Sequence, residues 1–146
     1  MKCNIMAAGL SIKQADFAQF QEAFEVVARE LLTEADLQAV IETDGNLNAS
    51  EMNLQTAQML AMQVWGQGFA PPLFYDDFKV INQRVVGEKH LKLVLEKESL
   101  EKDKKRFDAI FFGQTEFLPE QIQAVYQLQT NTYNGLQSVQ LQIFNV

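Results

Sequence analysis

The chain has 146 residues, of which 47% are apolar, and a formal net charge of -7 from 12 basic and 19 acidic side chains. This composition predicts a globular protein with one good core or two small ones, and it excludes a disordered chain. No apolar run reaches the roughly 18 to 20 residues of a membrane span and the N-terminus has no secretory pattern, so we expect a cytoplasmic protein. A single cysteine, Cys3, and a single histidine, His90, exclude an intramolecular disulfide and a Cys/His zinc site.

The positive charge is concentrated in one part of the chain. Residues 73–113 carry nine of the 12 basic side chains, whereas residues 1–72 carry three basic and nine acidic ones and residues 114–146 carry no basic one. Nucleic-acid backbones are bound by clustered Lys and Arg, so the net charge argues against a strong nucleic-acid binder. Any contact with nucleic acid is therefore expected within residues 73–113.

The first part of the chain predicts two helices and one strand. Residues 13–32 repeat apolar side chains at spacings of three and four, which indicates an amphipathic helix. Residues 37–42 form a short β-branched run that favours a strand. Ser50 is expected to cap a second helix that ends at Trp65. Two helices and one strand cannot bury their apolar faces well against one another, so residues 1–68 are interpreted as the remainder of a larger α/β domain.

The chain changes character near residue 70. Gly66, Gly68 and the pair Pro71-Pro72 stop a helix and disfavour a central strand, while the residues after them alternate as in a sheet. This change predicts a second domain at residues 69–146.

The second domain is predicted to be all β. Its five strands are expected at residues 73–86, 90–98, 107–112, 122–132 and 136–144. Leu91, Leu93 and Leu95 alternate with His90, Lys92, Val94 and Glu96, which places the leucines on a core face and the others on a partly solvated one. Asn134-Gly135 suits a type I′ hairpin. With a connection between the third and fourth strands, the pattern predicts a small OB-like barrel, and the fold class is α+β: a remnant of an α/β domain followed by a five-stranded barrel.

This architecture supplies a candidate nucleic-acid site. OB-folds bind single strands across the face of strands two and three, between the first hairpin and the loop joining strands four and five. The candidate DNA-binding residues are Arg84, Lys89, His90, Lys92 and Tyr133. Phe112 or Tyr126 is a further ring for base stacking, which is worth about 1 to 3 kcal/mol per base. The alternative is that the cations are ordinary solvated residues and the rings are core.

Several motifs resemble those of RecJ-type single-stranded-DNA exonucleases, in the same order and spacing. Residues 6–10, Met-Ala-Ala-Gly-Leu, resemble the end of a Gly-Gly-His-x-Met-Ala-Ala-Gly-Leu motif in the DHH-associated domain of that family. The likeness continues through residues 65–69, 85–92, 108–112 and 131–142, and covers almost the whole chain. It implies that residues 1–68 are the end of a DHH-associated domain and that residues 69–146 are an OB-fold domain.

The family cleaves single-stranded DNA from its 5′ end with Mg²⁺ or Mn²⁺, in recombination and repair. The resemblance implies that the catalytic DHH domain would precede residue 1, and Asn4 stands where the family motif has histidine. The chain alone is therefore expected to bind single-stranded DNA without cutting it, with no catalytic residue, metal or cofactor of its own. The implied partners are single-stranded DNA, the DHH domain and a single-strand-binding protein.

Two other functions remain open. A protein-interaction module, docking a partner such as a single-strand-binding protein beside Trp65 and Phe69, is consistent with the acidic balance of residues 1–72. An independent hydrolase is disfavoured, because no histidine is placed to activate a serine. The pair Asp76-Asp77 is expected to be a turn or a solvated pair rather than a metal site, since neighbouring strand residues point to opposite faces.

Overall fold

The computed structural model describes residues 9–34, 36–37, 40–66, 68–98 and 104–146. The chain forms two compact units, Met1–Ile41 and Glu42–Val146, and each is described by itself. No helix among the described residues is long and apolar enough to cross a membrane.

The first unit contains a 3₁₀ turn, η1 (Gln14–Asp16), followed by helix α1 (Phe17–Leu31), which confirms the helix expected over residues 13–32. The rings of Phe20 and Phe24, one turn apart, lie 5.8 Å from each other. The strand expected over residues 37–42 is wrong for residues 37 and 40–42, and residues 38 and 39 lie outside the described residues. A β-branched run forms a strand only where a neighbour completes its hydrogen bonds, and the described residues here have no such neighbour.

The second unit begins with a segment that leads into helix α2 (Leu54–Ala61). The cap expected at Ser50 is wrong: Asn53 is the N-cap, and its side chain accepts a hydrogen bond from the Thr56 amide at 3.0 Å. Asn caps a helix as well as Ser does, so residue type alone did not decide between them. The helix ends at Ala61 rather than at Trp65, whose indole N–H instead donates to the Leu60 carbonyl at 3.0 Å.

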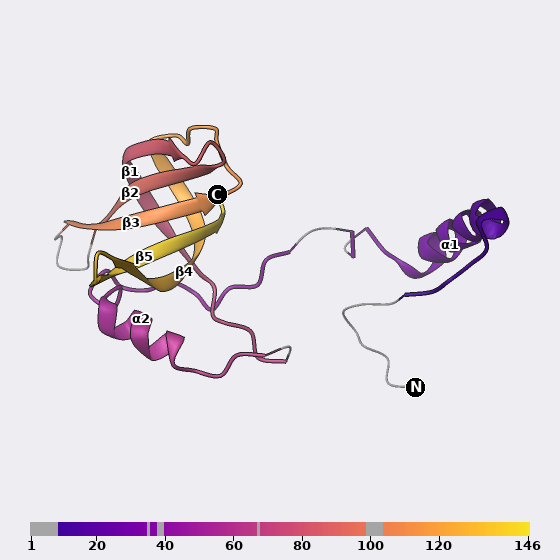
Figure 1. The fold of residues 1–146 in the computed structure, drawn as a ribbon, viewed down its shortest axis with the longest axis horizontal. Coiled ribbons are helices and arrows are strands. Elements are labelled where there is room, and N and C mark those ends of the chain that lie inside the picture. The colour runs from indigo at the N-terminus through magenta and orange to yellow at the C-terminus, as the bar shows by residue number, and fades with distance from the viewer. Residues whose placement is uncertain (1–8, 35, 38–39, 67, 99–103) are drawn as a thin grey trace. The chain divides into compact units, whose positions relative to one another are not determined.

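Five strands form a closed barrel in the order β1-β2-β3-β5-β4. They are β1 (Phe74–Val86), β2 (His90–Glu98), β3 (Lys104–Phe112), β4 (Gln121–Tyr133) and β5 (Leu136–Asn145). All neighbouring pairs are antiparallel except β3 with β5, which are parallel. This confirms the OB-like α+β fold (Figure 1). The third strand starts three residues before residue 107, because Lys104 and Lys105 continue the ladder with β2.

The alternation expected in β2 is confirmed, since Leu91, Leu93 and Leu95 are fully buried in the barrel core. The expected hairpin between β4 and β5 is also confirmed: Asn134 and Gly135 have φ angles of 50° and 77°, the positive values that a type I′ turn requires.

Helix α2 packs against the barrel, mainly on β4 (Figure 1). Ala57 on this helix is fully buried, and Met52 just before it is also part of the barrel core. In the structure, therefore, the segment from Glu42 onward belongs to the same compact unit as the barrel. The predicted boundary at residues 68 and 69 separates a DHH-associated domain from an OB-fold domain. The division into compact units does not test it, so it stays a prediction.

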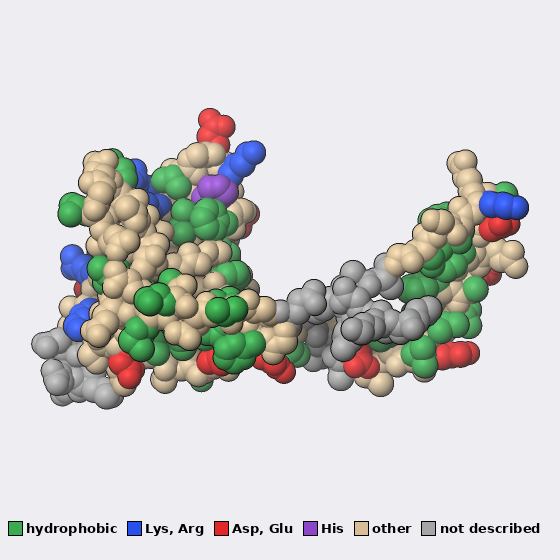
Figure 2. All heavy atoms as spheres, turned by 60° about the horizontal axis from the view of Figure 1, so that its bottom comes forward, with side chains coloured by type: hydrophobic (Ala, Val, Ile, Leu, Met, Phe, Trp, Pro, Cys, Tyr) green, Lys and Arg blue, Asp and Glu red, His purple; other side chains and the backbone are tan. Residues whose placement is uncertain are grey.

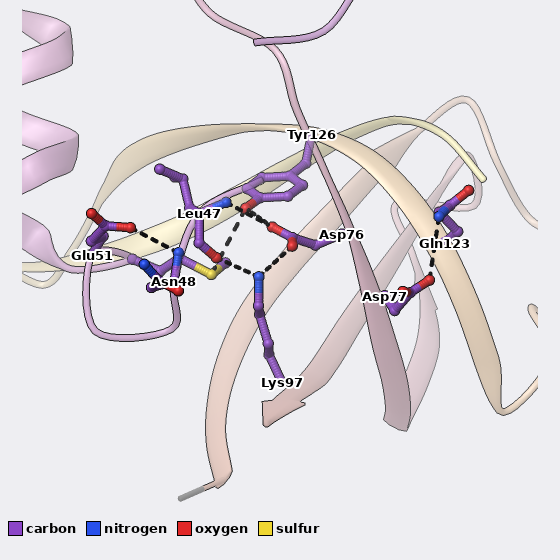
Figure 3. Close-up of polar contacts among 9 residues, drawn as sticks. Leu47, Asn48, Glu51, Asp76, Asp77, Lys97, Gln123 and Tyr126 are labelled. Atoms are coloured by element: carbon purple, nitrogen blue, oxygen red, sulfur yellow. Dashed lines mark hydrogen bonds and ion pairs between the residues drawn. The ribbon is translucent and has the colours of Figure 1, made fainter. Parts of the chain in front are cut away.

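A buried polar cluster links the start of this unit to the barrel interior (Figure 3). Asp76 on β1 is only 5% exposed and forms an ion pair with Lys97 of β2. Its carboxylate also accepts hydrogen bonds from the Tyr126 hydroxyl at 2.7 Å and from the Leu47 amide at 3.2 Å. Lys97 in turn donates to the Leu47 carbonyl.

Two expectations are corrected by this cluster. Asp76 and Asp77 do point to opposite faces of β1, but Asp76 is buried rather than solvated, because Lys97 supplies its counter-charge. Tyr126 is fully buried, so it is not a ring available for stacking. Burial, together with the hydrogen bond to Asp76, raises the pKa of Tyr126 far above its ordinary value and keeps its hydroxyl a donor.

Candidate nucleic-acid interface

The outward face of the barrel is organised in rows, because register partners on neighbouring strands point to the same side of a sheet. One row joins β1, β2 and β3 near the first hairpin and consists of Val86, His90 and Phe112. The next, which we call the central row, crosses all five strands at Arg84, Lys92, Ile110, Gln142 and Gln127. The row beyond it consists of Asn82, Val94, Asp108, Gln140 and Gln129.

Four of the five residues proposed from the sequence lie together at one end of this face. Arg84 and Lys92 are direct register partners, His90 begins the same strand as Lys92, and Lys89 lies in the turn just before it. With the neighbouring Phe112, these residues are called the basic end of the barrel. Figure 2 shows the histidine beside basic and hydrophobic side chains at a tip of the barrel.

Among the described residues, no ion pair involves a cation of the basic end. Within the described part of the chain, the ion pairs involve Arg29, Lys79, Lys97, Lys104 and Arg106. None of these described pairs involves Arg84, Lys89 or Lys92. Because an unpaired cation keeps its full attraction for an anion, this end of the face is the one suited to phosphate groups.

Phe112 and His90 form an edge-to-face pair with ring centroids 5.0 Å apart and an interplanar angle of 81°. The Gly113 amide donates to Nδ1 of His90 at 3.1 Å, which leaves Nε2 as the N–H donor of the neutral ring. Phe112 is 51% exposed although it lies on a strand. Its ring is therefore held in place by His90 and open to a stacking partner.

Tyr133 lies at the other end of the face. It pairs with Leu136 at the start of the β4–β5 hairpin and is 73% exposed. Leu136 is four residues before Gln140, the register partner of Asp108, and so lies on the side where β3 begins. The structure therefore does not bring Tyr133 together with the basic end, and the two flank the face from opposite sides.

Acidic side chains mark the limits of the face. Asp108 is exposed beside the central row, where its charge opposes that of Lys92. Burial alone would raise the pKa of Glu96, but hydrogen bonds from Arg106 and Lys104 outweigh it and lower the pKa of this carboxyl. Lys79 donates a hydrogen bond to Glu120, and this interaction favours the charged lysine and raises its pKa. These three cations outside the basic end are thus occupied by carboxylates.

The described residues include no group of three or more His, Cys, Asp or Glu side chains that could hold a metal ion. The barrel face carries cations at the basic end, carboxamides on β4 and β5, and the exposed ring of Phe112.

Comparison with known proteins identifies the family of the chain. Residues 43–145 match the family model described as the RecJ OB domain. The chain belongs to the RecJ OB domain family. It is 40% identical over 146 residues to the single-stranded-DNA-specific exonuclease RecJ of Haemophilus influenzae, covering 94% of this chain and 25% of that protein. It is 36% identical over 149 residues to RecJ of Escherichia coli, covering 98% of this chain and 25% of that protein.

The chain thus spans about a quarter of the length of the RecJ relatives it matches. The crystal structure of RecJ from Thermus thermophilus in complex with Mn²⁺ superimposes with a TM-score of 0.69 at 22% identity. The superposition covers 94% of this chain and 20% of that one, and it shows that the fold is shared.

The amide-rich part of the barrel face was not predicted from the sequence. Gln127, Gln129, Gln140 and Gln142 lie together on β4 and β5, and Gln129 donates to the Gln142 carboxamide oxygen at 2.7 Å. A signal existed in the sequence: Gln140 and Gln142 alternate with the buried Leu141 and Ile143. That alternation marks an outward polar face, but only the barrel topology places it beside Ile110.

Proposed function

We propose that this chain is the DNA-holding portion of a RecJ-like 5′ to 3′ single-stranded-DNA exonuclease of recombination and repair, and that it binds a single strand without cutting it. The observation that carries the proposal is the basic end, where Arg84, Lys89 and Lys92, which form no ion pair among the described residues, lie at the same end of the β2–β3 face as the exposed Phe112 ring. The names of the relatives, which specify single-stranded DNA, support it. In this proposal residues 1–68 are the end of a DHH-associated domain.

The basic end would hold the strand in two complementary ways. Arg84, Lys89 and Lys92 would neutralise phosphates, and Nε2–H of His90 would donate to a phosphate oxygen. Phe112 would stack on a base, which requires no particular sequence because every base has a π-face. Hydrolysis, with the Mn²⁺ or Mg²⁺ named in the T. thermophilus RecJ structures, would take place in the rest of the enzyme.

The proposal is tested by fluorescence anisotropy with a labelled single strand of about 20 nucleotides, longer than the largest OB-fold site, and with the matching duplex. We expect saturable binding that prefers the single strand and weakens with salt. If Arg84 and Lys92 each contact one phosphate, the double variant Arg84→Ala/Lys92→Ala should make the slope of log K against log salt shallower by about 1.4.

The matched control is Lys79→Ala/Arg106→Ala, which also removes one lysine and one arginine, but from residues paired with Glu120 and Glu96. This control should keep most of the salt slope. Asp108→Asn should raise the affinity for the single strand, because it removes an anion beside Lys92. Equal effects of the two double variants would remove Arg84 and Lys92 from the site, since only total charge would then matter.

A second candidate function is a protein-interaction module, which could dock a single-strand-binding protein. It is favoured by exposed apolar side chains on and after α2, namely Met59, Met62, Val64 and Phe69. It predicts no DNA binding even at low salt, together with a saturable complex with a peptide or protein. The same anisotropy titration therefore separates the two functions.

A further inference from the structure

We propose that the bound strand continues along the central row into a groove beside Trp65, where a nucleobase enters and stacks on the indole ring. This inference rests on the proposed function. The groove has a volume of about 270 Å³ and lies between α2 and β4. Its walls include Leu60, Trp65, Pro71, Pro72, Gln127 and Gln129.

The groove is continuous with the nucleic-acid face. Gln127 ends the central row and Gln129 ends the row beside it, and both glutamines also line the groove. The hydrogen bond from Gln129 to Gln142 extends this amide surface toward Ile110 and Lys92. With about 4.8 Å between strands, the central row crosses four spacings, or about 19 Å, from Arg84 to Gln127. A strand leaving the basic end along this row is thereby led to the groove.

The chemistry of the groove fits a base better than a phosphate. The described residues that line it include no charged side chain. Trp65 is fixed by the bond from its indole N–H to Leu60 and by stacking with Phe69 at 5.1 Å and 29°. The glutamine carboxamides carry both donors and acceptors, so they can bond the edges of different bases. An apolar cavity of about 150 Å³ holds a benzene ring, so the groove has room for one base.

The apolar rim of the groove is open to solvent. Figure 2, turned so that the α2 side of Figure 1 comes forward, shows hydrophobic side chains exposed over this part of the barrel. Phe69, which stacks on Trp65, is itself exposed. The Trp65 ring is therefore half-buried beside an entrance rather than enclosed in the core.

Trp65 is the single tryptophan of the chain, so its fluorescence reports directly on the groove. An unlabelled oligothymidylate of about 20 nucleotides should quench this fluorescence over the concentration range in which anisotropy shows binding. A strand of equal length with an abasic backbone should bind through its phosphates and cause no quenching. Binding by oligothymidylate without quenching would overturn the inference and leave the proposed function standing, whereas no binding by anisotropy would overturn both.

A pair of neighbouring substitutions gives a second test. Ala61 lines the groove and is exposed, whereas the adjacent Met62 is 81% exposed and is not among the lining residues. Ala61→Glu should reduce affinity for oligothymidylate about five-fold or more and abolish the quenching, the loss expected when a base loses its stacking partner. Met62→Glu adds the same charge next to the groove and should retain the quenching. Equal losses in both variants would contradict base entry, because a general charge effect would explain them.

Discussion

Replacing Lys97 by methionine should destabilise the barrel far more than the same replacement at an exposed lysine. The Lys97 ammonium pairs with the Asp76 carboxylate and also donates to the Leu47 carbonyl (Figure 3). The side chains of Lys97 and Asp76 are 13% and 5% exposed. Methionine keeps the length of the side chain but removes the charge, so Asp76 is left as a buried carboxylate with only the Tyr126 hydroxyl and the Leu47 amide as partners.

Breaking a buried ion pair on one side costs about 3–5 kcal/mol, because the remaining charge has lost both water and its counter-ion. A single domain is stable by only about 5–15 kcal/mol, so the variant should lose a large share of its free energy of unfolding. At about 4 °C or more per kcal/mol for a domain of this size, the Tm should fall by at least about 12 °C.

The assay is urea unfolding followed by circular dichroism, together with a thermal scan. Lys79→Met is the matched control: its partner Glu120 is exposed, so this variant should unfold close to the unmodified chain. The double variant Asp76→Asn/Lys97→Met should recover part of the loss, since asparagine carries no charge but keeps an acceptor for Tyr126. A Lys97→Met variant no less stable than Lys79→Met, or a double variant no more stable than Lys97→Met, would refute the reasoning.

Two further outcomes are expected. Phe112→Ala should weaken single-strand binding about five-fold or more by removing a stacking ring, whereas Tyr75→Ala, on the β1–β4 side of the barrel, should leave the anisotropy isotherm unchanged. Glu96 should titrate below its usual pKa of 4.5, so that its favourable contribution to stability is complete above pH 4.5 and is lost only as the pH falls through the lower folded value. NMR titration of the Glu96 carboxyl carbon checks this, and Arg106→Ala should move the midpoint upward.

The strands were predictable because local signals and tertiary contacts agree in the barrel. The alternation of Leu91, Leu93 and Leu95 and the Asn134-Gly135 turn both follow from rules that act over a few residues. The segment over residues 37–42 has the same β-branched character, yet its described residues form no strand, since pairing depends on a partner that composition does not reveal.

The candidate site was predictable only where it is local in sequence. Arg84, Lys89, His90 and Lys92 surround one hairpin, so recognising that hairpin was enough to bring them together. The central row was not predictable, because it depends on the parallel pairing of β3 with β5, which joins Ile110 to Gln142 across the barrel closure. The buried Asp76 illustrates the same limit: its counter-charge, Lys97, lies on the neighbouring strand, and neither residue by itself indicates burial.

Strand β4 connects the buried polar cluster to the groove, because its inward and outward faces belong to different sites. Tyr126 points inward to Asp76, while its neighbour Gln127 points outward to end the central row and line the groove. Helix α2 forms the opposite wall of the groove. The segment before this helix is held against the barrel by two hydrogen bonds of Leu47, from its amide to Asp76 and from Lys97 to its carbonyl. The buried polar cluster therefore contacts both elements that form the groove, β4 through Tyr126 and the segment before α2 through Leu47. If the groove takes a nucleobase as proposed, this fixation of both elements lowers the cost of binding, because the protein then loses little conformational freedom.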